Sequence, residues 1–506
     1  HRFVPNIIDA VKRGVLEAGG LPLTFPTISL GEILVSPTSM LYRNLLAMET
    51  EEMIKAYPMD SVVLIGGCDK TIPAQLMASV SANLPAIFEV TGAMHTGNYK
   101  EKRIGACTDC RSYWAKYRSG TISVEELDRV QSSLCPTGGT CMVMGTASTM
   151  ACLTETMGMM LPGGATPLSG TGERLRHAAA TGRQAVTLAD RQYPRPRDII
   201  TKDAFYNMLT VLAAISGSTN AVVHLIALAR RCNIPLPLEE FHKISQGIPL
   251  CVNCKPAGQF YMEDFHEAGG VPALLKALKN KLILNTINVA GVALNDLLKS
   301  YHGPEKWQSV IFGLNKPLGE KGTISVLYGS LAPNGAVIKR AAASKHLLNH
   351  KGPAVVFNSP EDIARLIDDP DLQITPDHIL VLRNAGPRAC GMPEAGSLPI
   401  PKYLAEKGVK DMVRISDARM SGTAYGTVIL HCSPEAAIGG PLSIVKNGDE
   451  IELNLDKREI NLNIPEHEFH ARHKRWKPPP LPERGWPRLH AEHVLQADQG
   501  ADLEFL

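Results

Sequence analysis

The sequence predicts an α/β protein with two domains. A chain of 506 residues is too long for a single hydrophobic core. Up to about residue 326, apolar strand-like segments alternate with helical ones, which favours a mixed or parallel sheet flanked by helices. Beyond that point, short β-rich runs separated by Gly, Pro and Asp turns are typical of a compact β domain. We therefore expect an N-terminal α/β domain over residues 1–328 and a smaller β-rich, barrel-like domain over residues 329–506.

The elements of the first domain follow from apolar periodicity. Helical spacing covers Ile7–Leu16 and Ala204–Ile215, and the apolar run Pro85–Val90 predicts a buried strand. The polar turn Ser216–Asn220 can cap a long apolar helix over Ala221–Cys232. These segments supply the alternation on which the α/β prediction depends.

The second domain is predicted from short strands between turn residues. The predicted strands are Ala354–Phe357, His378–Arg383, Met412–Ile415, Thr427–Leu430 and Ile451–Leu455. The proline-rich and basic stretch Lys474–Pro482 predicts a segment that runs over the surface.

Composition limits the partners of this chain. Apolar residues make up 44% and charged residues 20%, as in ordinary globular proteins. A net charge of +2 gives no reason to expect nucleic acid or an anionic membrane as a partner, and no apolar run has transmembrane length. Eleven irregularly spaced cysteines in so long a chain favour reduced thiols, some of them in a metal site, over a disulfide framework. We expect a cytoplasmic protein.

One loop carries three ionisable side chains in a row. The apolar run Val62–Ile65 predicts a buried strand, Gly66-Gly67 ends it, and Pro73–Ala82 predicts a helix. Cys68, Asp69 and Lys70 lie between strand and helix, where α/β proteins hold their chemistry. Burying these groups together is costly unless something such as a metal ion pairs with them.

A second glycine turn has a similar pattern. Gly138-Gly139 precedes Cys141, and the following residues predict a helix that begins at this cysteine and runs through Met150. The positive end of a helix dipole favours a thiolate, so the segment predicts a reactive Cys141.

Other motifs favour structural explanations. The pairs Cys107–Cys110 and Cys251–Cys254 have CxxC spacing but lie too far apart for a zinc ribbon, so buried or incidental thiols are favoured. The phosphate-loop spacing GxxxxGK[ST] and the zinc motif HExxH are both absent. Taken singly, Glu32 and Glu394 resemble surface carboxylates and Ser421 resembles a polar turn residue. Because these three residues occur together with the two glycine loops, we treat them as candidate functional-site residues.

Together, these motifs resemble the dihydroxy-acid and phosphogluconate dehydratase family along nearly the whole chain. The string Thr140–Met150 is most similar to the sugar-acid branch, which acts on aldonates such as L-arabinonate or D-xylonate. Dihydroxy-acid dehydratases usually carry a different, Tyr- and Asn-containing string after that cysteine. The segments that carry the resemblance are Gly66–Thr71, Gly139–Met150, Ser216–Leu225, Arg383–Pro387, Gly391–Glu394, Ser416–Gly422 and Gly500–Asp502.

The resemblance implies two cofactors. By position, Cys68 and Cys141 resemble thiolate ligands of an iron–sulfur cluster of the 2Fe-2S type, since soft thiolates suit such clusters. The resemblance likewise implies magnesium on oxygen ligands. The residues that match its ligands are Glu32, Asp69 and Glu394, with Lys70 matching a lysine that carries a carbamate.

The resemblance also implies a reaction. Family members remove water from a 2,3-dihydroxy acid and give a 2-keto-3-deoxy acid. Ser421 resembles the base that takes the proton from carbon 2, as an alkoxide near magnesium, while an iron atom acts as Lewis acid on the hydroxyl of carbon 3. The family implies a homodimer or homotetramer. The alternatives are a branched-chain dihydroxy-acid dehydratase and a non-catalytic iron–sulfur sensor or binding protein. Retention of the magnesium ligands and of the base argues against the sensor.

One family feature is absent from the printed sequence. The family has a third cluster cysteine shortly before a string that matches Lys12–Val15 here. Counting back places that cysteine at or just before the first residue, and His1-Arg2-Phe3 contains none. Either the sequence is truncated, or the cluster is incomplete and the protein inactive. The intact motifs downstream favour truncation.

Overall fold

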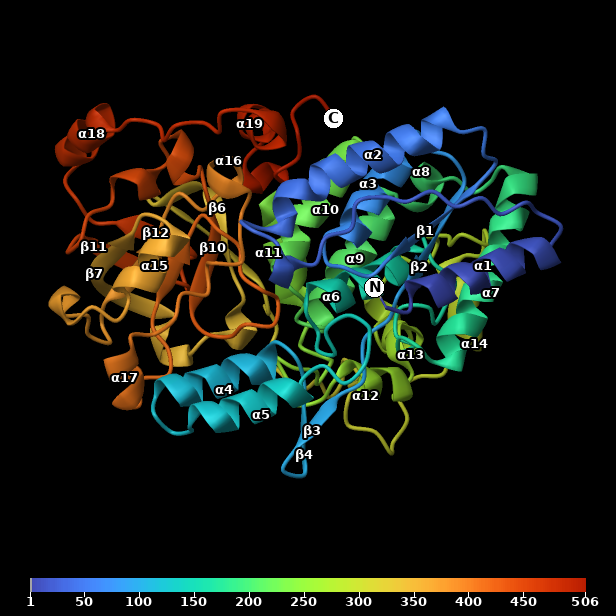
Figure 1. The fold of residues 1–506 in the computed structure, drawn as a ribbon, viewed down its shortest axis with the longest axis horizontal. Helices are drawn as coiled ribbons and strands as arrows, with labels where there is room; N and C mark the ends of the chain where they lie inside the picture. Colours follow the sequence, from blue (N-terminus) through green and yellow to red (C-terminus); the bar gives the residue numbers. More distant parts are fainter. Residues whose placement is uncertain (1) are drawn as a thin grey trace.

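A computed structural model describes residues 2–506 of the chain. Figure 1 shows a helical part, coloured blue to yellow, beside a β-barrel coloured orange to red. The predicted fold class, helices with a small sheet followed by a barrel-like β domain, is confirmed. No helix in residues 2–506 combines the length and the apolarity needed to span a membrane.

The helical part surrounds a small parallel sheet. Strands β1 (Val62–Gly66) and β2 (Ala86–Val90) pair in parallel, and β3 (Gly97–Tyr99) and β4 (Lys102–Ile104) form a separate hairpin. The predicted parallel sheet flanked by helices has only two strands in the described residues, because most of the apolar segments are buried helices. The helices are α1 (Val4–Glu17), α2 (Arg43–Ala56), α3 (Thr71–Ala82), α4 (Thr108–Arg118), α5 (Val124–Ser133), α6 (Thr146–Met157), α7 (Gly172–Arg191), α8 (Pro196–Ile199), α9 (Lys202–Ala214), α10 (Asn220–Arg231), α11 (Leu238–Gly247), α12 (Met262–Glu267), α13 (Gly270–Ala277) and α14 (Leu294–Ser300).

Helix α7 is fixed to the sheet by a buried ion pair. Thr171 begins the helix, because its side-chain oxygen accepts a hydrogen bond from the backbone N–H of Arg174. Arg174 then reaches the carboxylate of Glu89 on β2 at 2.9 Å, and His177 contacts the other oxygen at 2.7 Å. The fully buried charges are therefore paired, as burial requires.

The second part is a closed barrel of eight strands. Its order is β10-β6-β5-β12-β11-β7-β8-β9, and β9 pairs with β10 to close it. The predicted boundary at 328/329 falls inside the first barrel strand. The strands are β5 (Ser325–Gly329), β6 (Ala332–Ile338), β7 (Asn349–Phe357), β8 (Ile379–Leu382), β9 (Arg414–Ser416), β10 (Val428–Ser433), β11 (Glu450–Asn454) and β12 (Glu459–Leu462). The helices of this part are α15 (Pro360–Leu366), α16 (Pro387–Cys390), α17 (Lys402–Glu406), α18 (Glu466–Arg475) and α19 (Gly485–His493).

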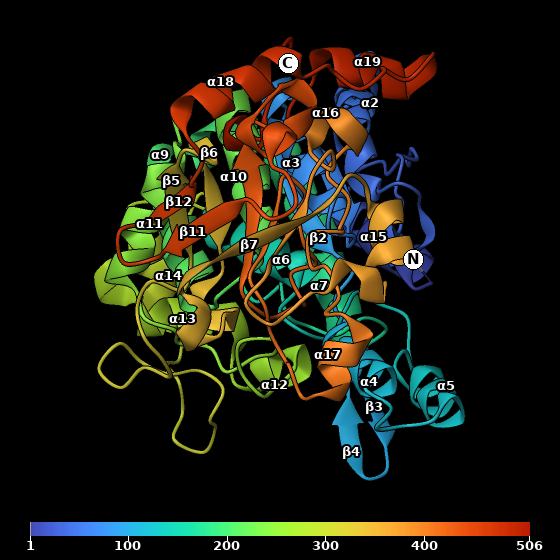
Figure 2. The same cartoon turned by 90° about the vertical axis from the view of Figure 1, so that its left-hand side faces the viewer.

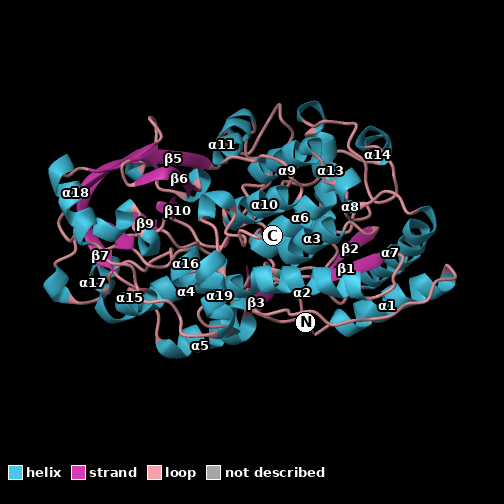
Figure 3. Cartoon of the chain, turned by 90° about the horizontal axis from the view of Figure 1, so that it is seen from above, coloured by secondary structure: helices cyan, strands magenta, loops and turns pink. Residues whose placement is uncertain are grey.

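The barrel presents two long loops at the same end. Strands β8 and β9 are adjacent and parallel, so the residues that follow each of them leave the barrel on one side. The loop after β8 contains Glu394, and the loop after β9 contains Arg419 and Ser421. Seen from above in Figure 3, the barrel strands gather on one side and β1 and β2 lie among the helices on the other.

The C-terminal residues return to the helical part. Figure 2 shows α18 and α19 along one end of the molecule and the hairpin β3–β4 projecting from the opposite end. Beyond α19, the carboxylate of Asp502 binds Arg231 of α10 at 2.7 Å, and the carbonyls of Gly500 and Ala501 accept hydrogen bonds from Arg43 of α2. This segment therefore ties the end of the chain to two buried helices.

Candidate active site between the helical part and the barrel

The loop from β1 to α3 has the predicted strand–loop–helix form. Strand β1 ends at Gly66 and α3 begins at Thr71, which leaves Cys68, Asp69 and Lys70 in the loop. A Cβ atom on Gly67 would lie 1.7 Å from the hydroxyl oxygen of Thr91, so only glycine fits there. The close approach to β2 fixes the path of the loop and the direction of the three side chains.

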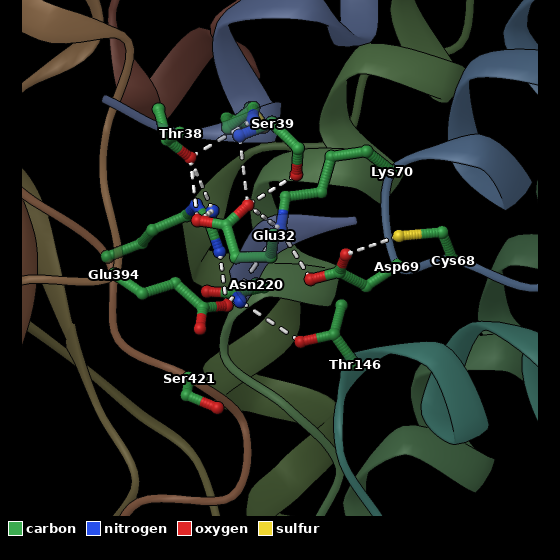
Figure 4. Close-up of polar contacts among 12 residues, drawn as sticks. Glu32, Thr38, Ser39, Cys68, Asp69, Lys70, Thr146, Asn220, Glu394 and Ser421 are labelled. Carbon is green, nitrogen blue, oxygen red and sulfur yellow. Dashed lines mark hydrogen bonds and ion pairs between the residues drawn. The ribbon is translucent and has the colours of Figure 1, made fainter. Parts of the chain in front are cut away.

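Three carboxylates surround the ammonium group of Lys70, which is almost completely buried. The Nζ atom lies 3.0 Å from Glu32 Oε2 and 3.8 Å from Glu394 Oε1, and it also pairs with Asp69. Figure 4 shows these side chains directed toward one another, with Glu394 coming from the barrel and the others from the helical part. The structure thus brings together the four residues that the sequence predicts as magnesium ligands.

Arg419 is a second buried cation that sequence reasoning missed. One guanidinium nitrogen lies 2.8 Å from Glu32 Oε1 and another lies 2.6 Å from Glu394 Oε1. The residue is inside the segment Ser416–Gly422 that carried the resemblance, so its position was the available signal. Arg419 links a barrel loop to a carboxylate of the helical part.

Glu32 remains ionised in this setting. Burial by itself would raise the pKa of its carboxyl group, but Arg419, Lys70 and the hydroxyl groups of Ser39 and Thr38 lower that pKa to about 2. Thr38 donates to Glu32 Oε1 at 2.8 Å, and the Ser39 backbone N–H and hydroxyl both donate to Oε2. The carboxylate is therefore available as an anionic ligand at any physiological pH.

This donor set suits a hard divalent cation. Carboxylate oxygens are the ligands that magnesium prefers, and three of them already face one buried positive charge. Within residues 2–506, no three His, Cys, Asp or Glu side chains are yet arranged around a common point at metal-ligand distances. The Lys70 ammonium group pairs with all three carboxylates.

The prediction that Cys141 begins a helix is wrong. Helix α6 begins at Thr146 with Gly145 as its N-cap, so Cys141 lies in the preceding loop and gains nothing from the helix dipole. A hydrogen bond with Cys107 and burial raise the pKa of the Cys141 thiol well above its usual value. Burial and the charge of Asp69 likewise raise the pKa of Cys68 to about 12. Both thiols are neutral here, and coordination to a metal would deprotonate them.

The loops of Cys68 and Cys141 share one wall. Gly67 and Thr140, the neighbours of the two cysteines, line the same small cavity. Gly139, with φ of +140°, lies so close to the backbone of Met94 that a Cβ atom would be 2.5 Å from its nitrogen. Soft thiols on two neighbouring glycine-bounded loops are a donor set that fits an iron–sulfur cluster.

Cys107 differs from the incidental thiol that the sequence suggested. Its sulfur lies 3.1 Å from the sulfur of Cys141. The other CxxC pair agrees with the prediction, because Cys251 and Cys254 are buried and their sulfurs contact backbone carbonyls. The family's third cysteine, predicted at or before His1, lies outside the described residues.

Ser421 lies where the barrel meets the start of α6. Its hydroxyl oxygen is 2.8 Å from that of Thr423, and the residue is buried. A Cβ atom on the next residue, Gly422, would lie 2.5 Å from the hydroxyl of Ser218, which bonds Thr146 of α6 at 2.8 Å. Figure 4 shows Ser421 below Glu394, with Thr146 to its right. The structure therefore places Ser421 among the other candidates; its role as a base stays a prediction.

Comparison with known proteins agrees with this arrangement. The N-terminal domain of the dihydroxy-acid/6-phosphogluconate dehydratase family matches residues 1–297, and its C-terminal domain matches residues 309–501. The chain belongs to this dehydratase family. The family prediction is confirmed, and the domain matches divide the chain close to the start of the barrel.

Similar proteins include sugar-acid dehydratases and dihydroxy-acid dehydratases. An L-arabinonate dehydratase of Rhizobium leguminosarum bv. trifolii is 44% identical, over 99% of this chain and 87% of its own length. A 6-deoxy-6-sulfo-D-gluconate dehydratase of Pseudomonas putida is 42% identical, over 100% of this chain and 88% of its own. A dihydroxy-acid dehydratase of Thermodesulfovibrio yellowstonii is 38% identical, over 100% of this chain and 92% of its own length. Identity is higher to these two sugar-acid enzymes, which agrees with the predicted branch.

Proposed function

We propose that this protein is a hydro-lyase that converts a sugar acid, an aldonate, to its 2-keto-3-deoxy acid with the help of an iron–sulfur cluster and magnesium. The observation that carries the proposal is the convergence of Glu32, Asp69 and Glu394 on buried Lys70, beside the loops of Cys68 and Cys141. A binding protein without catalysis has no need of such a costly collection of charges.

The chain's own residues would hold both cofactors. Glu32, Asp69 and Glu394 would bind magnesium, and Lys70 as a carbamate would change from a cation to another oxygen ligand. Cys68 and Cys141 would bind a 2Fe-2S cluster as thiolates. When bound, the two cofactors supply Lewis acidity to the substrate's carboxylate and 2-hydroxyl and to its departing 3-hydroxyl.

Ser421 would move the proton. A base on one face of the substrate must take the proton from carbon 2 as the hydroxyl of carbon 3 leaves. Ser421 is buried, and its oxygen lies 2.8 Å from that of Thr423, whose hydroxyl can donate a hydrogen bond to the serine alkoxide. Gly422, the next residue, packs so closely against Ser218 that it leaves no room for a side chain there.

The substrate class follows from similarity. The two sugar-acid relatives are more similar to this chain than the dihydroxy-acid dehydratase is, at 44% and 42% against 38% identity. A branched-chain dihydroxy acid is the alternative substrate. A homodimer or homotetramer in the cytoplasm is the assembly and location that we propose with this activity.

The test is a direct comparison of substrates. Anaerobically prepared protein with magnesium is incubated with L-arabinonate, D-xylonate and 2,3-dihydroxyisovalerate, and the 2-keto product is measured. We expect an aldonate to give the larger kcat/KM. Preference for dihydroxyisovalerate would move the protein to the other branch. An iron-loaded protein with no dehydration of any of the three would contradict the proposal.

A further inference from the structure

Two cysteine thiols of the candidate site lie in direct contact. Cys107 Sγ is 3.1 Å from Cys141 Sγ, and both residues carry free thiols that are partly exposed. Both side chains pack against the same small apolar cluster. The sulfurs of a disulfide bond lie about 2.05 Å apart, so bonding requires these two sulfurs to approach by only about 1 Å.

The backbone at Cys107 holds its sulfur in this position. The residue has φ of +73° and ψ of −69°, and the N–H of Thr108 donates to the carbonyl of Ala106 at 3.2 Å. These values describe a γ-turn with positive φ, a rare and strained conformation for a residue with a side chain. Strain of this kind persists only where the surrounding structure fixes it.

Contacts on both sides of the turn keep Cys107 beside Cys141. The backbone N–H of Ala106 donates to the sulfur of Met142, the residue after Cys141, at 2.9 Å. The hydroxyl of Thr108 donates to the carbonyl of Thr423 in the barrel at 3.1 Å. The turn is therefore fixed to the loop of Cys141 and to the barrel loop that carries the proposed base.

We propose that Cys107 and Cys141 form an oxidative modification site, at which a peroxide converts the two thiols of the cluster-free protein to a disulfide that blocks insertion of the cluster. The site itself rests on the geometry of the two sulfurs. Its effect on the cluster rests on the proposed function, because it requires Cys141 to be a cluster ligand. With the cluster bound, the Cys141 sulfur is engaged and the disulfide cannot form.

The reaction balances with hydrogen peroxide as the oxidant. One sulfur, as a thiolate, attacks the peroxide; a sulfur–oxygen bond forms, the O–O bond breaks, and hydroxide leaves as water after taking up a proton. The second sulfur then attacks the sulfenic acid, so that the S–S bond forms, the S–O bond breaks and a second water leaves. The two thiols lose two electrons and two protons, and the peroxide is reduced to two waters.

The test uses the full chain without iron. The parent, Cys107→Ser and the control Cys110→Ser are treated anaerobically with one equivalent of hydrogen peroxide, and unreduced tryptic peptides are mapped by mass spectrometry. Cys110 belongs to the same CxxC motif but packs against a separate apolar cluster around Val130. We expect a bridge between Cys107 and Cys141 in the parent and in Cys110→Ser, and none in Cys107→Ser.

A second variant guards against misfolding. Glycine adopts positive φ freely, so Cys107→Gly removes the thiol and relieves the strained turn. Its circular dichroism spectrum should equal that of the parent, and its Cys141 should remain unbridged after the same treatment. A bridge from Cys141 to another cysteine in this variant, in the same yield as in the parent, would overturn the inference.

Iron uptake measures the consequence of the bridge. The treated parent is freed of peroxide and given iron and sulfide without added thiol. Its uptake of iron should fall in proportion to the fraction of protein that carries the disulfide, and reduction with dithiothreitol before reconstitution should restore it. Unchanged uptake in fully bridged protein would refute the block.

The outcomes separate this inference from the proposed function. A parent protein that takes up about two irons and dehydrates an aldonate, but forms no bridge or joins Cys107 to Cys110 instead, refutes only the modification site. A parent protein that forms the Cys107–Cys141 bridge but takes up no iron before treatment refutes the proposed function and leaves the site standing.

Discussion

The helical part and the barrel contribute different chemistry to the candidate site. The helical part supplies the thiols of Cys68, Cys107 and Cys141 and the ammonium group of Lys70, all from loops that precede helices. The barrel supplies Glu394, Arg419 and Ser421 on two loops that follow adjacent parallel strands. Neither part completes the site alone. In our proposal, the barrel end positions the base and one carboxylate against the metal-binding residues that the helical part provides.

Two ion pairs that join the helical part to the barrel differ in how deeply they are buried. Arg419 and Glu32 pair inside the site, where the arginine side chain is 1% exposed. Arg458 of the barrel and Glu239 of α11 pair at the surface, with side chains 28% and 48% exposed. Buried pairs are costly to break, and exposed pairs contribute little. We therefore expect the buried Arg419–Glu32 pair to contribute more than the exposed Arg458–Glu239 pair to holding the two parts together.

The largest expected effect on stability is that of Arg419→Met. Removing this buried cation leaves Lys70 as the one remaining cation beside the half-buried carboxylates of Glu32 and Glu394 among the pairs described above, so the metal-free protein should lose about 3 kcal/mol of unfolding free energy. Urea unfolding followed by circular dichroism measures the loss. A change below about 1 kcal/mol would show that the buried pair is no more important than a surface pair.

A second test uses pH, because two glutamates of the two parts have opposite pKa shifts. Burial and the neighbouring Asp417 raise the pKa of Glu435 in the barrel from 4.5 to about 7, whereas the pKa of Glu32 is lowered. A raised native pKa means that native Glu435 keeps its proton above pH 4.5. The stabilisation that comes from this raised pKa is complete below pH 4.5 and is lost as pH rises through about 7.

The matching variant is Glu435→Gln, which cannot titrate. Between pH 4 and pH 8, the stability of the parent relative to this variant should fall by about 3 kcal/mol, the equivalent of the pKa shift. Denaturant unfolding at each pH measures the difference. A difference that does not change with pH would show that the pKa of Glu435 is not raised in the native barrel.

Ser421→Ala tests the chemical contribution of the barrel. The variant should fold and bind both cofactors, yet lose at least roughly 100-fold in kcat, because it lacks the proposed base. Exchange of the substrate's carbon 2 proton with solvent should be lost too. Ser443→Ala is the matched control, since the buried hydroxyl of Ser443 has no hydrogen-bond partner among residues 2–506. Parental turnover in Ser421→Ala would remove the serine from the mechanism.

The smallest expected effect is that of Arg458→Met. Its pair with Glu239 is exposed and bidentate, at 2.7 and 2.9 Å, and should contribute at most about 1 kcal/mol. The effect should shrink further in high salt. A loss as large as that of Arg419→Met would mean that the surface contact, not the site, holds the parts together.

Local sequence predicted most of the fold. The strand Val62–Ile65, the helix after it and five of the barrel strands are where apolar periodicity put them. The strands β5, β6 and β12 were not predicted individually, because barrel closure depends on pairing between distant segments. The start of α6 was misplaced, since an apolar run after a glycine turn does not show where helical hydrogen bonds begin.

The site was predictable only as a set of residues. The order of the motifs indicated Glu32, Asp69, Lys70, Glu394 and Ser421, but no spacing rule brings residues 32 and 394 together. Arg419 and Cys107 were missed because their importance lies in contacts made across the fold: to Glu32 and Glu394, and to Cys141. Sequence motifs indicated the chemistry, and tertiary packing determined the partners.

The central claim is that one magnesium site is built from both parts of the chain. It is tested most directly by measuring magnesium binding in Asp69→Asn, from the helical part, and Glu394→Gln, from the barrel, with Glu239→Gln as control. Both site variants should bind magnesium at least roughly tenfold more weakly than the parent, because each removes anionic charge from a hard-cation site. The visible spectrum of the cluster should be unchanged. Parental magnesium affinity in Glu394→Gln would contradict the account and place the site in the helical part alone.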